Sequence, residues 1–356
     1  MYDIVIVGAG PAGVTFARLV GKKYKVLLLD RRELIKKREG EGAFEKCCGG
    51  LIAPDAQQML AKLGLGVPQK VLVGPQLFTV RTLDIQQKIE RYYQRHYINI
   101  DREKFDRWQV SVLPSSVDVL CDTLFRKYQI ENGIYKIHFQ TNGKEYTEKT
   151  KYLIGADGAF SGIRRQLKPE FVQRAYISIQ EWFQVKNMQP YFSAIFDEEI
   201  SDFYSWIIPK EDTLILGTAV SPKQNAIPKF NLLKEKLHKY GFEFRNSIKR
   251  NGAFILRPRN TRQIFLGQDK LALIGEAAGW ISPTSAEGLS YAFCSATALA
   301  KSFQADPENL ASEYAKNTRD LRTNILLKNL KAPFMYNTFL RKAVMKSGLL
   351  SMEIYK

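Results

Sequence analysis

The chain has 356 residues, enough for one large discontinuous domain or two interleaved domains. Apolar residues make up 45% and charged residues 25%, a globular composition that excludes a mainly disordered chain. No apolar stretch reaches the ~18–20 residues that a membrane-spanning helix needs. Met1-Tyr2-Asp3 leads directly into the apolar run Ile4–Val7, so we expect no signal peptide. The four cysteines form no Cys-x-x-Cys pair and the three histidines are scattered, so we expect no metal site and a reduced, cytoplasmic protein.

The formal net charge of +17 predicts attraction to anionic partners. Nine basic residues lie between Lys316 and Lys356, where only Asp320 and Glu353 oppose them and many apolar residues are interleaved. One interpretation is a helical pair that packs on the body with a solvated basic face. The other is an amphipathic tail on an anionic membrane, at its inner face, where each basic residue contributes ~1 kcal/mol. Because the usual nucleic-acid motifs are missing, we expect no nucleic-acid partner.

Residues 4–158 contain both apolar strand patterns and helical patterns. We expect a strand at 4–7, a helix ending near residue 20, a parallel strand at 25–30, irregular chain at 31–50, a helix at 53–63, strands within 71–95 and a helix at 101–112. Residues 117–158 predict a short strand, a helix, a hairpin around Asn142-Gly143 and a strand ending at Gly155.

Residues 176–260 are rich in aromatic and β-branched residues and predict an antiparallel sheet with turns at 209–210 and 222–223 and a helix at 232–240. The parallel-sheet pattern resumes at 271–275, and a helix follows at about 286–300. The predicted fold is therefore α/β, a Rossmann-like domain interrupted by an antiparallel β-sheet domain. The boundaries are 1–70, 96–175 and 262–300 for the nucleotide-binding domain, 71–95 and 176–261 for the β-rich substrate domain, and 301–356 for the C-terminal basic helical region.

A glycine motif lies between the first strand and the first helix. Gly8, Gly10 and Gly13 form Gly-x-Gly-x-x-Gly, in which the glycines permit the turn, the approach of a pyrophosphate and close helix–strand packing. The helix that starts at Pro11-Ala12 presents free N–H groups to the phosphates. Asp30, followed by Arg31, ends the second strand 22 residues after Gly8, where an acid can bind a ribose hydroxyl. These residues predict a dinucleotide site.

Two later segments suggest which dinucleotide it is. Residues 153–165, which contain Gly155-Ala156-Asp157-Gly158, resemble the Gly-Ala-Asp-Gly segment of flavoprotein hydroxylases, and residues 273–279 resemble their Gly-Asp-Ala-Ala segment. Together with the glycine motif they identify the chain as similar to the para-hydroxybenzoate hydroxylase superfamily, which binds FAD. The resemblance assigns FAD contacts to Asp157, Gly158, Gly275 and the helix start at Gly288-Leu289.

One position departs from the family pattern. The family's aspartate, which contacts the ribityl chain, is Glu276 here, and the longer side chain implies a shifted loop or a water-mediated contact. Asp101-Arg102 resembles the start of the family's Asp-Arg-x-x-Phe-Asp-x-Trp segment. The resemblance makes Arg102 a candidate FAD contact, and the alternative is a surface charge at a helix start.

Two narrower segments resemble the geranylgeranyl reductases. Lys46-Cys47-Cys48-Gly49-Gly50 is similar to their Lys-x-Cys-Gly-Gly segment, and Tyr204-Ser205-Trp206-Ile207-Ile208-Pro209 to their Tyr-x-Trp-x-Phe-Pro motif. The likeness to the CbrA-type subgroup of oxidoreductases runs nearly the full length. The same hexapeptide is near the Trp-x-Trp-x-Ile-Pro motif of flavin halogenases, but its first tryptophan is missing.

The resemblance places three side chains in a substrate cavity beside the flavin. Tyr204 and Trp206 alternate along a strand, so their rings share one side and suit a prenyl chain; the alternative is that both are core residues. Cys48 would position substrate or donate a weak hydrogen bond, or else is a small buried apolar residue. Cys48, Gly49 and Gly50 are also candidate FAD contacts.

The resemblance implies an FAD-dependent reductase in which N5 of reduced FAD delivers hydride to a C=C bond of a prenyl lipid. An FAD monooxygenase is the main alternative, and a flavin halogenase and a non-catalytic prenyl-binding flavoprotein are others. No second Gly-x-Gly-x-x-Gly motif exists, so we expect NADPH to dock transiently, or a ferredoxin or flavodoxin to supply electrons.

Overall fold

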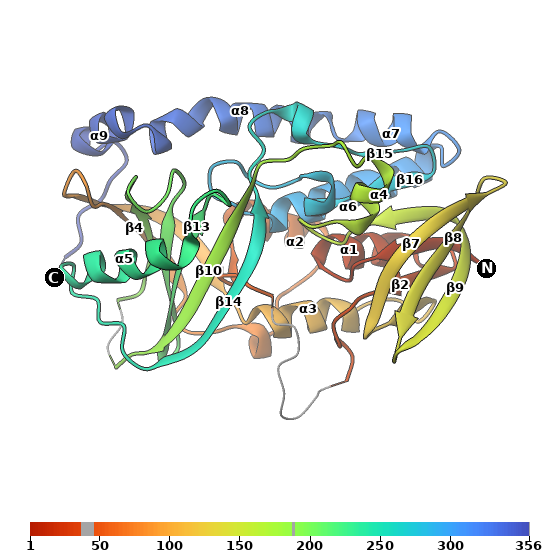
Figure 1. Ribbon diagram of the computed structural model, residues 1–356, viewed down its shortest axis with the longest axis horizontal. Helices are drawn as coiled ribbons and strands as arrows, with labels where there is room; N and C mark the ends of the chain where they lie inside the picture. Colours follow the sequence, from red (N-terminus) through yellow and green to blue (C-terminus); the bar gives the residue numbers. More distant parts are fainter. Residues whose placement is uncertain (37–45, 187–188, 356) are drawn as a thin grey trace.

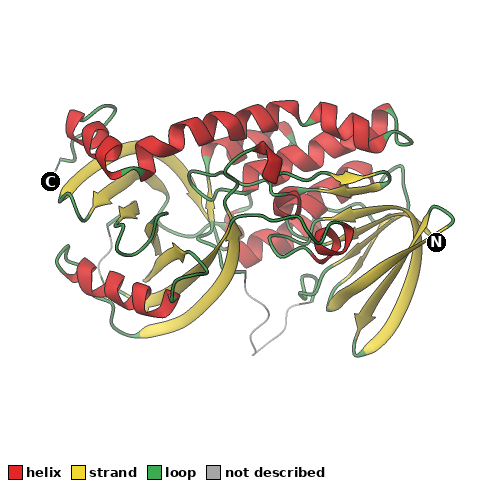
Figure 2. Ribbon diagram, turned by 45° about the horizontal axis from the view of Figure 1, so that its top comes forward, coloured by secondary structure: helices red, strands yellow, loops and turns green. Residues whose placement is uncertain are grey.

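The computed structural model describes residues 1–36, 46–186 and 189–355. Its strands form two sheets that lie at opposite ends of the molecule, and helices pack beside both (Figures 1 and 2). A row of helices from the last part of the chain runs along one side of the two sheets (Figure 1). The α/β architecture with a C-terminal helical region is therefore confirmed.

The first sheet contains the parallel core that the apolar runs predict. Its strand order is β15-β16-β9-β1-β2-β6, with β7 and β8 added beside β9. The bounds are β1 Tyr2–Val7, β2 Val26–Leu29, β6 Val117–Leu120, β7 Thr123–Glu131, β8 Ile134–Thr141, β9 Lys144–Gly155, β15 Gly267–Gln268 and β16 Leu271–Leu273. Ile4 and Ile6 of β1 pack in one hydrophobic cluster, and Val5 and Val7 pack in another on the opposite face. Burial of both faces explains why this strand is a continuous apolar run.

Residues 123–131 correct one expectation. We expected a helix between the short strand at 117 and the hairpin at Asn142-Gly143, but these residues form β7, which pairs antiparallel with β8. Asn132-Gly133, both with positive φ, forms a second tight hairpin turn. This turn and the cross-strand pairs decide the conformation of residues whose own pattern is weak.

The second sheet has the order β14-β10-β13-β12-β11-β4-β5-β3. The bounds are β3 Leu51–Ile52, β4 Leu77–Asp84, β5 Ile89–Asn99, β10 Ala175–Gln184, β11 Tyr191–Phe196, β12 Ser205–Lys210, β13 Thr213–Val220 and β14 Ser247–Leu256. It is not wholly antiparallel as expected, because β4 and β11 pair in parallel. Pro209-Lys210 ends β12 rather than forming a turn, and β5 crosses the boundary predicted between residues 95 and 96.

Most helices lie at predicted positions, although not all predicted ends agree and α4 was not predicted. Their bounds are α1 Pro11–Val20, α2 Pro54–Lys62, α3 Arg102–Ser111, α4 Gly162–Leu167, α5 Ala226–His238, α6 Leu289–Ala305, α7 Leu310–Asn317, α8 Arg319–Tyr336 and α9 Thr338–Ser347. Helix α5 begins six residues before the predicted start, where Asn225 accepts the N–H of Ile227. None of the described helices is both long enough and apolar enough to cross a membrane.

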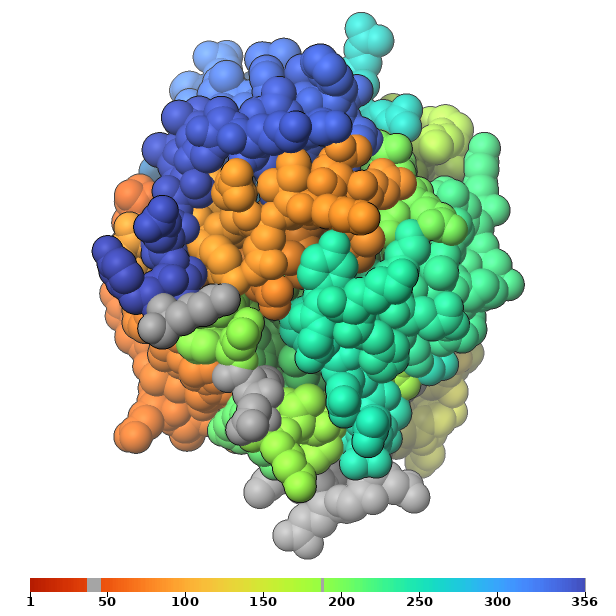
Figure 3. Space-filling model, turned by 90° about the vertical axis from the view of Figure 1, so that its left-hand side faces the viewer, coloured from red at the N-terminus to blue at the C-terminus, as the bar shows by residue number. Residues whose placement is uncertain are grey.

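The C-terminal helices are fixed to the second sheet. Arg341 of α9 forms a buried ion pair with Asp84 at the end of β4, at 2.7 Å. The backbone N–H of Met352 donates to the carbonyl of Tyr92 on β5. Figure 3 shows the last residues, in dark blue, beside the strands around residues 77–99, in orange. The predicted packing of a helical pair on the body is confirmed for its inner side.

Candidate functional site

The glycine turn leaves open space at only one of its three motif glycines. Gly8 has φ +109°, and a Cβ there would lie 2.3 Å from the carbonyl oxygen of Ala156. A Cβ on Gly13 would lie 2.0 Å from the Gly8 carbonyl oxygen, whereas one on Gly10 would meet nothing within 4 Å. Packing therefore requires glycine at positions 8 and 13, whereas no contact within the protein requires glycine at position 10. The open side at Gly10, where α1 begins, is where an anion can approach the helix N-terminus.

Asp30 lies beside this turn, as predicted, but it already has partners in the protein. Its Oδ2 accepts the N–H of Ala9 at 2.6 Å, and its Oδ1 accepts the N–H of Arg32 at 2.8 Å. The Arg32 guanidinium also forms an ion pair with Asp106 of α3, with a distance of 2.6 Å between Nη1 and Oδ2. Arg31 is exposed at the end of the strand. Sequence reasoning missed Arg32, although its place two residues after the strand's acid was a usable signal.

Arg102 opens α3 and points into the protein. Its Nε donates to Asp106 Oδ1 at 2.8 Å, and its side chain is only 9% exposed, which contradicts the alternative of a surface charge. Burial alone would raise the pKa of Asp106, but Arg102 and Arg32 lower it to about 2. The second guanidinium nitrogen, Nη2, is buried without a hydrogen-bond partner. An unpartnered donor on a buried cation fits an anionic or polar ligand group.

The two neighbouring cysteines face different surroundings. Cys47 Sγ lies 3.4 Å from Gln180 Oε1 of β10, and burial raises the pKa of its thiol to about 12. Cys48 Sγ accepts from Arg102 Nη1 and from the Gly50 N–H, each at 3.4 Å. Burial would raise the pKa of Cys48, but these donors and Lys46 lower it below the ordinary value. The two neighbouring thiols therefore differ: the pKa of Cys48 lies below the ordinary value and that of Cys47 lies above it.

The two segments that resemble geranylgeranyl reductases meet in space. A Cβ on Gly49 would lie 2.4 Å from Cδ1 of Ile208, so the Cys48–Gly50 loop lies directly against β12. Lys210 Nζ donates to the carbonyl of Gly50 at 3.0 Å and to that of Ile100 at 2.7 Å. Burial lowers the pKa of Lys210 to about 7. Lys210 was not among the predicted residues, although it directly follows the motif's proline.

Tyr204 and Trp206 lie in one aromatic cluster, and their ring centroids are 5.6 Å apart. Tyr204 Oη donates to the carbonyl of Ser285 at 2.7 Å. Trp206 is 6% exposed, its ring covers Gly217, and its Nε1 is buried without a partner. Phe203 and Tyr336 extend the cluster toward α8. Tyr204 precedes β12, which begins at Ser205, so the predicted alternation along a strand does not include Tyr204, although the two rings are in contact.

The remaining predicted residues lie around the start of α6 and the end of β9. Arg164 Nη1 donates to the carbonyl of Ala277 at 2.6 Å and ties the Asp157 loop to the Gly275 loop. Glu276 Oε1 accepts the N–H of Leu256 on β14 at 3.0 Å, and burial raises the pKa of this carboxyl. Gly288 precedes the first residue of α6, Leu289, which is buried. Because the carboxylate of Glu287 accepts the Ser290 N–H, part of this helix end already has an anionic partner.

Three observations test whether these residues fit FAD. Gly10 leaves open space at a helix N-terminus, Arg102 Nη2 lacks an acceptor, and Asp157 Oδ1 is buried without a donor. The first two suit a pyrophosphate, and an unpaired carboxylate oxygen suits a hydroxyl-rich ribityl chain. The residues therefore fit the cofactor, while the individual contacts stay predictions. Within residues 1–36, 46–186 and 189–355, no group of His, Cys, Asp or Glu is arranged to hold a metal ion.

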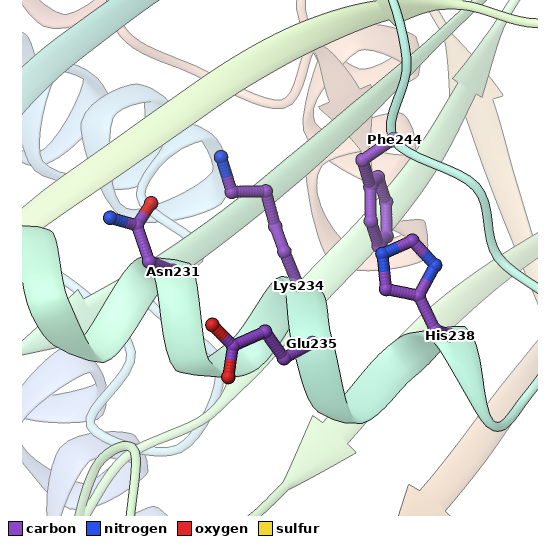
Figure 4. Close-up of a pocket in the computed structure, with 5 residues that line it drawn as sticks. All are labelled: Asn231, Lys234, Glu235, His238 and Phe244. Atoms are coloured by element: carbon purple, nitrogen blue, oxygen red, sulfur yellow. The ribbon is translucent and has the colours of Figure 1, made fainter.

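A separate groove of about 350 Å³ lies along α5. Figure 4 shows its lining side chains, with His238 and Phe244 side by side at one end and Asn231, Lys234 and Glu235 along the helix. It contains none of the motif residues. We therefore do not assign the candidate site to it.

Comparison with curated proteins gives matches over nearly the whole chain. Protein CbrA of Escherichia coli O6:H1 is 41% identical over 348 residues, which cover 98% of this chain and 94% of that protein. Protein CbrA of Shigella sonnei is also 41% identical and is covered to 97%. A family model described as an FAD binding domain matches residues 131–239.

Solved structures show the same fold at low identity. A geranylgeranyl bacteriochlorophyll reductase-like protein from Thermoplasma acidophilum has a TM-score of 0.71 and 19% identity, with 99% of this chain and 88% of that chain covered. The flavin-dependent halogenase CmlS has a TM-score of 0.71 and 18% identity, with 92% and 63% covered. PqsL of Pseudomonas aeruginosa, described as a probable FAD-dependent monooxygenase, has a TM-score of 0.69 and 15% identity, with 98% and 99% covered. The near full-length identity places the chain in the CbrA family, among the FAD-dependent oxidoreductases of the para-hydroxybenzoate hydroxylase superfamily.

Proposed function

We propose that this FAD-dependent oxidoreductase reduces C=C bonds of a prenyl lipid. The observation that carries the proposal is the aromatic cluster around Tyr204 and Trp206. Trp206 lies on strand β12, and Ile208 of the same strand contacts the Cys48–Gly50 loop. Flat apolar rings supply large contact area to an isoprenoid chain without demanding hydrogen bonds from it. The fold shared with a geranylgeranyl reductase-like protein supports the same substrate class.

The protein's own residues would bind and orient the reactants. Gly10 and Arg102 would hold the anionic part of the cofactor, and Lys210 would hold the Cys48 loop in place through the Gly50 carbonyl. Cys48 would border the substrate, and Tyr204 and Trp206 would keep water from the alkene. Reduced FAD, when bound, supplies the hydride, and a proton adds to the other alkene carbon.

Each double bond consumes two electrons, which must come from an external donor. We propose NADPH or a reduced carrier of the ferredoxin or flavodoxin kind. The net charge of +17 would attract an acidic carrier and speed its encounter at low salt. Rates of flavin reduction that do not change with ionic strength would exclude electrostatic docking of such a carrier.

The test is an anaerobic reoxidation. The FAD-loaded protein is photoreduced without oxygen, geranylgeranyl phosphate is added, and the oxidised flavin band near ~450 nm is followed. Return of the band together with a lipid that has gained two hydrogens supports the reductase. Return only after air enters shows that geranylgeranyl phosphate is not an acceptor, and a hydroxylated product would then identify a monooxygenase. Lipid binding with no turnover in either condition favours a non-catalytic prenyl-binding flavoprotein.

A further inference from the structure

The outward side of α8 carries apolar residues that the fold does not use. Ile325 faces inward and is fully buried, while Leu326, Leu327, Leu330 and Phe334 are 51%, 50%, 64% and 52% exposed. At about 100° per residue these four side chains share one stripe of the helix. We name Leu326, Leu327, Leu330 and Phe334 the outer stripe. Most surface apolar residues are scattered singly, so a contiguous stripe indicates an interaction surface.

Packing of α8 and α9 does not depend on the outer stripe. The helices are held from their inner side by Ile325, by the ion pair from Arg341 to Asp84, and by Arg91 Nε, which donates to the Met345 carbonyl at 2.8 Å. Figure 1 shows α7, α8 and α9 along one edge of the molecule. The outer stripe is therefore held in place and turned outward by contacts that it does not make itself.

The charged residues of α8 and α9 are mainly basic. Lys331 on α8 and Lys346 on α9 are exposed, and Phe339, the second residue of α9, is 78% exposed. The chain from Lys316 to Lys356 has nine basic residues and two acidic ones. Leucine and phenylalanine on one helix face with flanking lysines are the pattern of a helix that lies in the interface of an anionic bilayer.

A protein partner fits these residues less well. Lysine is depleted in protein–protein interfaces, whose centres prefer tyrosine, tryptophan and arginine. A second copy of this chain would bring another net charge of +17 against the same basic surface. We propose that the outer stripe of α8, with Lys331 and Lys346, docks the enzyme on an anionic lipid surface.

The same helix connects this surface to the aromatic cluster. Tyr336, the last residue of α8, donates a hydrogen bond to the Thr284 carbonyl, and its ring lies 5.3 Å from that of Phe203. A lipid drawn from the surface would thus be one helix away from Tyr204. This link to substrate delivery rests on the proposed function, whereas docking itself does not.

The test measures sedimentation of the FAD-loaded full chain with vesicles, without turnover. Phosphatidylcholine vesicles are compared with phosphatidylcholine–phosphatidylglycerol vesicles at low and high salt. The protein should bind the anionic vesicles more tightly, and salt should weaken this binding. Leu330→Glu with Phe334→Glu should reduce partitioning by tenfold or more, from about 1.5–3 kcal/mol per buried apolar side chain. Lys331→Glu and Lys346→Glu should each reduce it about fivefold or more, from ~1 kcal/mol per basic residue.

Ile130→Glu is the matched control, because Ile130 on β7 is 57% exposed and lies outside the outer stripe. This variant should bind like the wild type. Equal binding of neutral and anionic vesicles, or no binding by folded yellow protein, would overturn the proposal. So would a dimer that Leu330→Glu dissolves, in the absence of vesicle binding. If vesicles bind but no prenyl lipid is reduced, docking stands and only the proposed reaction fails.

Discussion

Replacing Gly10 by valine should remove FAD while leaving the protein folded. Gly10 has φ −76° and ψ 178°, a conformation that valine adopts, and a Cβ there meets nothing within 4 Å. The new side chain therefore fills only the space that the pyrophosphate would need. At a hundredfold excess of FAD over its Kd, the wild type gains about 2.7 kcal/mol of unfolding free energy. Gly10→Val should lose this gain and keep the stability of the FAD-free wild type.

The assay is urea unfolding with and without added FAD, together with the flavin absorbance of the purified protein. Gly66→Val is the matched control, because Gly66 also has nothing within 4 Å of a Cβ but lies outside the motif. Gly13→Ala is the opposite case, since its Cβ would lie 2.0 Å from a backbone oxygen and should cost about 1–3 kcal/mol or more even without FAD. A Gly10→Val protein that purifies yellow and is still stabilised by FAD would refute the reasoning.

Three further substitutions test separate contacts. Burial lowers the pKa of Lys210 from 10.5 to about 7. Between these two pH values the unfolded chain binds one more proton than the folded protein, so the free energy of unfolding rises with pH. Lys210→Met should reduce this slope by up to ~1.4 kcal/mol per pH unit in urea unfolding, and an unchanged slope would contradict the assignment. Asp84→Asn leaves Arg341 buried without its charge partner and should cost about 3–5 kcal/mol in the same assay, whereas a loss below 1 kcal/mol would show a weak pair. Tyr204→Ala should keep FAD but weaken geranylgeranyl phosphate binding about tenfold or more in a fluorescence titration, Tyr204→Phe should not, and unchanged affinity in both would make Tyr204 a core residue only.

Local patterns in the chain were sufficient for the cofactor-binding half of the fold. The run at 4–7, the glycine turn and the strand ending at Asp30 are close in sequence, and their conformations follow from turn chemistry and two-sided burial. The pattern failed at 123–131, because an edge strand in a hairpin has few buried residues and its conformation depends on β8. The parallel pair of β4 and β11 was also beyond local reasoning, since more than 100 residues separate its strands.

The sequence by itself therefore determined the cofactor class, the order of the motifs and the basic, apolar character of the C-terminal region. Only the tertiary structure brought Lys210 to the Gly50 carbonyl, 160 residues away, and linked Arg32, Asp106 and Arg102 in one buried ion network. It also turned Glu276 toward Leu256 and decided which apolar side of α8 faces outward. These contacts join segments that are far apart in the sequence and that the strand connections bring together. A motif determines which residue types are present, but tertiary packing determines which neighbours position their side chains and shift their pKa values.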